Sequence, residues 1–147
     1  MAREGQNNSS KDHIRLKNFY LYTAVNHISG KHFSLIISNV DTDCMNIFLE
    51  QLSAQYLGKK IALIMDGAGW HKSKGLIVPE NIEIIYLPPY SPELNPVERL
   101  WLHIKSHVLR NKLYESLGEL EGSLCQFVRS MKVDTVAQIC RANYMLN

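Results

Sequence analysis

The chain has 147 residues, of which 46% are hydrophobic and 20% are charged, and its formal net charge is +2. These values are ordinary for a single soluble globular domain, and the net charge alone does not signal a nucleic-acid-binding protein. Three widely spaced cysteines form no CxxC pair, and the longest apolar runs are too short to span a bilayer. We therefore expect a cytoplasmic protein without a membrane partner.

The amino-terminal part predicts a polar arm followed by a β-hairpin. Residues 1–18 are expected to form a disordered arm, and residues 19–147 a folded domain. Aromatic and β-favouring residues are concentrated in "FYLYTAVN" and "FSLIIS", on either side of a turn signal at Ser29 and Gly30. This pattern is typical of two antiparallel strands joined by a short turn.

A helix and two buried strands are predicted next. The segment "VDTDCMNIFLEQLSAQYLG" is amphipathic, with Asp41 or Asp43 as its N-cap and Gly58 at its end. The runs "KKIALIMDG" and "IEIIYLP" are short and apolar, as in parallel strands that are buried on both faces. The segment between them is long enough for a crossover that contains a short helical turn.

Three helices complete the predicted domain. The first, "PVERLWLHIKSHVLRN", carries an apolar stripe made of Val97, Leu100, Trp101, Ile104 and Val108. Trp101 belongs to that stripe, so we expect it in the core rather than stacked on a base. Further helices are expected at residues 117–131 and 134–144. The whole order predicts an α/β domain with a mixed sheet flanked by helices.

Two carboxylates stand at the ends of these elements. Asp66 ends a buried strand, and ligands bind at the carboxyl ends of strands in open α/β sheets. The alternative is that Asp66 only caps a turn, since Asp-Gly is a common turn pair. Glu98 lies in the first turn of its helix, behind Asn95 as N-cap and Pro96 at the first helical position. Helix capping alone would explain Glu98.

Together the two carboxylates predict a metal site. If the two strands lie side by side, the loop "PPYSPELNP" returns over their carboxyl ends and brings Glu98 close to Asp66, and its prolines make that loop stiff. Carboxylate oxygens are the ligands that Mg²⁺ and Mn²⁺ prefer. A pair of such ions, about 3.5–4 Å apart, supports phosphodiester cleavage.

The motifs "MDGAGWH" and "LPPYSPELNPVERLW" resemble the C-terminal part of the catalytic domain of DDE transposases. The resemblance is to the Tc/mariner superfamily, in particular the bacterial insertion sequence 630 group, and it extends upstream into "YLYTAVNHISGKHFSLIISNVDTDCMNIFLEQL". It implies an RNase H-like fold and metal-dependent cleavage and joining of DNA at transposon ends and target sites. It also implies that Asp66 and Glu98 are the second and third catalytic carboxylates, which bind Mg²⁺ or Mn²⁺.

Three further residues are candidate neighbours of this site. His71 matches a histidine that often follows the second Asp of the family, and a structural or phosphate-adjacent place competes with a catalytic one. Arg99 and Lys105 lie on the Glu98 helix and could meet DNA phosphates. The alternative for both is a solvated helix face.

The sequence departs from the family at the first catalytic Asp, which should lie on an opening strand before the hairpin. Glu4 and Asp12 lie in no strand-like run, and Asp41 and Asp43 come after the hairpin. We therefore expect the sheet to lack its first strand, as in a second reading frame, a truncated copy or a mis-called start. Expected partners are DNA and an upstream transposase fragment or a second copy of the chain. Three functions remain open: an active transposase, an inactive remnant that keeps the fold and weak DNA binding, and an unrelated RNase H-like nuclease.

Overall fold

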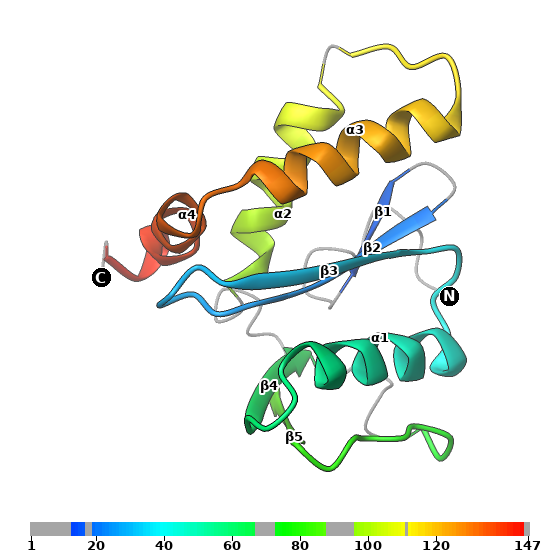
Figure 1. Cartoon of the computed structure of the whole chain (residues 1–147). Helices are drawn as coiled ribbons and strands as arrows, with labels where there is room; N and C mark the ends of the chain where they lie inside the picture. Colours follow the sequence, from blue (N-terminus) through cyan, green and yellow to red (C-terminus); the bar gives the residue numbers. More distant parts are fainter. Residues whose placement is uncertain (1–12, 17–18, 67–72, 88–95, 111, 146–147) are drawn as a thin grey trace. The chain divides into compact units, whose positions relative to one another are not determined.

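The computed structural model describes residues 13–16, 19–66, 73–87, 96–110 and 112–145. Figure 1 follows the elements along the chain, which are β1 (His13–Leu16), β2 (Phe19–Val25), β3 (His32–Ile37), α1 (Thr42–Gln55), β4 (Ile61–Asp66), β5 (Ile82–Leu87), α2 (Val97–Val108), α3 (Leu117–Ser130) and α4 (Val133–Met145). The contacts divide the chain into two compact units. Unit 1 comprises residues 1–22 and 35–95, and unit 2 comprises residues 23–34 and 96–147.

The predicted hairpin is confirmed. β2 lies between β1 and β3 in a three-stranded sheet. Across the hairpin, the hydroxyl of the buried Thr23 is hydrogen-bonded to that of Ser34 at 3.0 Å. The turn uses Gly30 at φ +83°, a left-handed conformation that glycine adopts without steric cost.

The expectation of a disordered arm was wrong at residues 13–16. These residues form β1, which pairs antiparallel with β2, so that His13 faces Tyr22 and Leu16 faces Phe19. The sequence "HIRL" alternates polar and apolar residues with the period of a strand, but four residues are too few for a pattern to be recognised. The backbone pairing with β2 stabilises these four residues as a strand. The rest of the expected arm, residues 1–12 and 17–18, lies outside the described residues.

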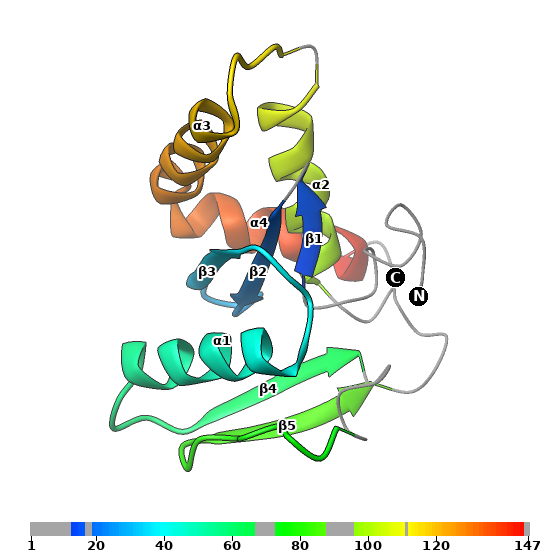
Figure 2. The same ribbon diagram turned by 90° about the vertical axis from the view of Figure 1, so that its right-hand side faces the viewer.

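Unit 1 contains a two-stranded parallel sheet, as predicted, but the expected burial of both faces was wrong, because Ile64 in β4 is 51% exposed and Ile85 in β5 is 46% exposed. β4 and β5 pair from Ile61 opposite Ile82 to Asp66 opposite Leu87, and α1 runs alongside them (Figure 2). The side chain of Asp41 accepts a hydrogen bond from the backbone N–H of Cys44, which confirms the first of its two predicted N-caps. The buried face of α1 is made of Cys44, Met45, Phe48, Leu49 and Leu52.

The predicted helical turn between β4 and β5 is tested only in the described part of that connection. Residues 73–81 contain turns but no helix, while residues 67–72 lie outside the described residues. The side-chain amide of Asn46 in α1 donates to the carbonyl of Gly75 at 2.9 Å and accepts from the N–H of Ile77 at 2.8 Å. These bonds satisfy backbone groups that a helix would otherwise pair, so the segment is anchored to α1 instead.

Unit 2 is built around α2. This helix packs against α3 and α4, and its predicted apolar stripe is buried at all five positions, with Trp101 only 1% exposed. The prediction that Trp101 belongs to the core is therefore confirmed. Neighbouring helices add Leu120, Leu124, Val136 and Cys140 to this core.

Candidate active site

Asp66 is the last residue of β4. Because β4 and β5 are parallel and Asp66 faces Leu87, both strands end at the same edge of their sheet (Figure 2). The residue before it, Met65, is 2% exposed and anchors this end of the strand in the core of unit 1. The backbone of Asp66 therefore stands at the carboxyl edge of a parallel pair, which is where α/β sheets bind their ligands.

Glu98 lies in the first turn of α2. Its side chain is half-buried, with the Oε2 atom inside the protein, and the adjacent Val97 is 5% exposed. The partial positive charge at a helix N-terminus favours a carboxylate there. Packing of Val97 and Leu100 fixes the helix start, so Glu98 projects from a rigid element.

The capping arrangement is tested only in part. Pro96 has helical dihedral angles, φ −65° and ψ −17°, but the regular hydrogen-bonded helix begins one residue later, at Val97. The first helical residue is therefore Val97 and not Pro96 as predicted. The predicted N-cap, Asn95, lies outside the described residues.

Asp66 and Glu98 belong to different units, so their proximity stays a prediction. Among the residues that the structure describes, no group of three or more histidine, cysteine, aspartate or glutamate residues is arranged to hold a metal ion. The donor type nevertheless fits the implied ions, since carboxylates at a strand end and a helix start offer the hard oxygen ligands of Mg²⁺ and Mn²⁺.

Arg99, one of the candidate neighbours, makes a contact within unit 2. Its Nε donates to the carbonyl of Ile139 in α4 at 3.1 Å. Its positive charge also acts on the thiol of Cys140, although burial is the stronger effect and raises the pKa of Cys140 to about 11. Arg99 therefore joins the start of α2 to α4 and steadies the turn that carries Glu98. Lys105 is half-buried further along α2, and His71 lies outside the described residues.

An aromatic cluster on α2 escaped the sequence analysis. The ring centroids of His103 and His107 lie 4.3 Å apart, and the ring of Phe127 on α3 lies 5.8 Å and 5.2 Å from them. Burial, and then the neighbouring His107, lower the pKa of His103. The spacing of four residues could have indicated the pair, because such residues are neighbours on a helix. The cluster packs α2 against α3 and adds no carboxylate to the site.

The chain matches a known family and two curated relatives. Residues 1–121 match the family described as DDE superfamily endonuclease. The uncharacterized protein y4pE/y4sA of Sinorhizobium fredii (strain NBRC 101917 / NGR234) is 36% identical over 107 residues, which cover 72% of this chain and 79% of the relative. The insertion element IS630 uncharacterized 39 kDa protein of Shigella sonnei is 33% identical over 119 residues, which cover 77% of this chain but 34% of the relative.

Among solved structures, the catalytic domain of Mos1 mariner transposase is similar, with a TM-score of 0.63 and 15% sequence identity. The likeness covers 89% of this chain and 72% of that chain. At 15% identity the likeness shows the fold alone, and it confirms the predicted RNase H-like α/β class. None of the helices in the described parts of the chain is both long and apolar enough to cross a membrane.

Proposed function

The chain belongs to the DDE superfamily of endonucleases, and from this premise we propose that it acts in DNA transposition through metal-dependent cleavage and joining of phosphodiester bonds. Its substrates would be the ends of a mobile element and the target DNA. The chain spans about a third of the length of the Shigella sonnei relative. For that reason the activity of the whole protein is a proposal.

The observation that carries the proposal is the position of Asp66. β4 ends at Asp66, at the edge where its parallel neighbour also ends, and ligands of α/β sheets bind at that edge, which supports a metal-binding role for this residue. Glu98 supplies a second carboxylate from the rigid start of α2. In this reading both residues are catalytic carboxylates that bind the same Mg²⁺ or Mn²⁺ ions.

Each group would have a defined task. When bound, the ions would activate the attacking water or DNA 3′-hydroxyl and stabilise the leaving oxygen. Asp66 and Glu98 would hold the ions from elements whose backbones are fixed by packing. Arg99 would act as a positioning residue, since its bond to the carbonyl of Ile139 ties the first turn of α2 to α4.

Metal binding tests the assignment without requiring activity. Isothermal titration with MnCl₂ should show binding to the unchanged chain and at least tenfold weaker binding to Asp66→Asn and to Glu98→Gln. Matched controls are Asp43→Asn and Glu119→Gln, which remove one charge each from the first turns of α1 and α3. Equal losses in the controls, or undiminished binding after either site substitution, would reject the site.

Cleavage gives a second test. The family's chemistry uses a third carboxylate on an opening strand, and the strand β1, "HIRL", contains none. We therefore expect the 147-residue chain to leave supercoiled plasmid DNA intact in the presence of Mg²⁺ or Mn²⁺. Nicking that disappears in Asp66→Asn would overturn this expectation and would show that another residue of this chain completes the site. We also propose that an upstream transposase fragment or a second copy of the chain is a partner, and that the protein is cytoplasmic.

A further inference from the structure

The turn of the hairpin packs against the junction between α3 and α4. A Cβ atom at Gly30 would lie only 1.8 Å from the carbonyl oxygen of Val133, so the two backbones approach as closely as glycine allows. Two residues further on, the side chain of His32 is hydrogen-bonded to the backbone of Met131. Residues 30–32 therefore run beside residues 131–133, and all of them belong to unit 2.

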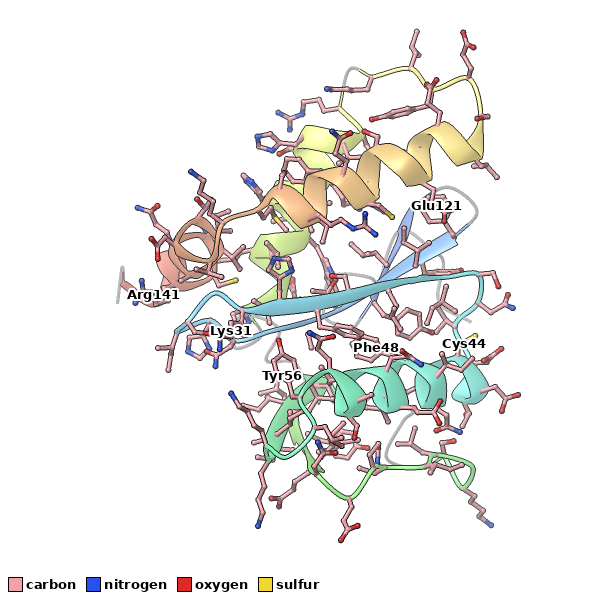
Figure 3. The ribbon with its side chains drawn as sticks, viewed as in Figure 1. Lys31, Cys44, Phe48, Tyr56, Glu121 and Arg141 are labelled. Atoms are coloured by element: carbon pink, nitrogen blue, oxygen red, sulfur yellow. The ribbon has the colours of Figure 1, made fainter. Side chains whose placement is uncertain are left out.

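This arrangement brings together the backbone segments that carry two lysines. Lys31, labelled in Figure 3, stands between the contacting residues Gly30 and His32, and Lys132 stands between Met131 and Val133. Both side chains are exposed. Because the residues on either side of each lysine are in contact, the backbones of Lys31 and Lys132 are held next to each other.

A third cation extends this group. Arg129 is exposed in the last turn of α3, three residues before Lys132. We name Lys31, Arg129 and Lys132 the junction patch. Within the described residues, none of the three forms an ion pair. The acidic residue beside the patch is Asp134, which is exposed in the first turn of α4, where the helix dipole favours a carboxylate.

Like charges that a rigid backbone holds together repel one another, and an anion that bridges them relieves the repulsion. Duplex DNA offers a row of such anions, about one phosphate charge for each 1.7 Å of helix axis. We infer that the junction patch binds the phosphate backbone of duplex DNA. This rests on the proposed function, because it assumes that DNA is the substrate. Such contacts fix the position of the duplex and do not read its sequence.

Salt dependence of binding tests the inference. A fluorescently labelled duplex is titrated with the 147-residue chain in EDTA at several KCl concentrations, and the affinity is followed by anisotropy. Loss of two phosphate contacts in Lys31→Ala/Lys132→Ala should lower the slope of log affinity against log salt by about 1.8, which is about 30-fold in affinity near 0.15 M salt. The matched control is Lys59→Ala/Lys60→Ala, two exposed lysines of unit 1, which should change the affinity less than about twofold.

Further variants separate charge from folding. Lys31→Arg/Lys132→Arg keeps both charges and should bind as the unchanged chain does. At equal ionic strength, inorganic phosphate should displace the duplex from the protein no better than chloride does. Stronger competition by phosphate would indicate an isolated phosphate site and would overturn the assignment to DNA.

The inference also fails if the unchanged chain shows no salt-dependent binding, if Lys31→Ala/Lys132→Ala keeps the full slope, or if the control pair loses as much. Because EDTA removes divalent ions, this assay reads DNA binding alone. Its outcome is therefore independent of the Mn²⁺ titration of Asp66 and Glu98, and either proposal can fail without the other.

Discussion

Replacement of Gly30 by alanine should destabilise the protein through two separate effects. The first is the left-handed backbone at φ +83°, which costs a residue with a Cβ atom about 1–2 kcal/mol. The second is steric, because the new Cβ would lie 1.8 Å from the carbonyl oxygen of Val133 and 3.0 Å from the backbone nitrogen of Ala137. Relief requires the turn to move away from α4, and overpacking of this kind costs about 1–3 kcal/mol.

Gly58 provides a matched control for the backbone effect. It has nearly the same dihedral angle, φ +86°, but a Cβ there would meet nothing within 4 Å. Gly58→Ala should therefore cost about 1–2 kcal/mol, and Gly30→Ala about 2–5 kcal/mol. The difference, about 1–3 kcal/mol, measures the close approach of the hairpin to α4.

Urea unfolding followed by circular dichroism measures both changes. The midpoint should fall in both variants, and further in Gly30→Ala, with little change in the dependence of unfolding free energy on urea. If Gly30→Ala is no less stable than Gly58→Ala, the hairpin turn does not pack on the start of α4. The junction patch would then lose its structural basis as well.

Three other predictions concern a helix cap, a histidine and the thiols. Asp41→Ala should lower the urea midpoint, while Asp41→Asn should retain it at neutral pH, and a midpoint equally low in both variants would contradict the cap. Because the cap hydrogen bond lowers the pKa of Asp41, its contribution to stability is present above the pKa of the unfolded state and is lost as the pH falls through the pKa of the folded state. Burial, and then the neighbouring His107, lower the pKa of His103, so its contribution to stability should be complete above pH about 6.5 and should be lost as the pH falls below that value. In urea titrations at a series of pH values, His103→Gln should reduce this dependence of the unfolding free energy on pH, and an unchanged dependence would contradict the prediction. A thiol reagent at pH about 8 should modify the half-buried Cys125 well before the buried Cys140, whose pKa is raised to about 11. The fast phase of the modification should disappear in Cys125→Ser, and its persistence would refute the order.

Periodicity made the fold predictable where elements are long. The apolar stripe of α2 specifies its buried face, including Trp101, because five residues repeat with the period of a helix. The runs that became β4 and β5 were recognisable because each is short and mostly apolar, but their burial on both faces was wrongly predicted, since Ile64 and Ile85 are 51% and 46% exposed.

Short elements and long-range contacts were not predictable in this way. β1 has four residues and is defined by its pairing with β2. The segment after Ser73 follows the side chain of Asn46, which lies 29 residues before Gly75. A local sequence pattern contains neither partner, so it does not reveal these contacts.

The candidate site shows the same limit. Asp66 and Glu98 were identified from their places at a strand end and a helix start, and the structure has both elements where they were predicted. The junction patch was not predicted, because Lys31 and Lys132 are brought together only by the contact of Gly30 with Val133. Proximity of this kind is a property of the tertiary fold.

The most direct test of the account is whether Asp66 and Glu98 bind one shared metal ion. Fe²⁺ can replace Mg²⁺, and with ascorbate and peroxide it generates hydroxyl radicals that cut the backbone beside the ion. Fragment analysis should reveal cuts next to both residue 66 and residue 98, suppressed by excess Mg²⁺ and absent at both places in Asp66→Asn and in Glu98→Gln. Cuts beside only one of the two residues, or cuts at residue 66 that persist in Glu98→Gln, would contradict a shared site.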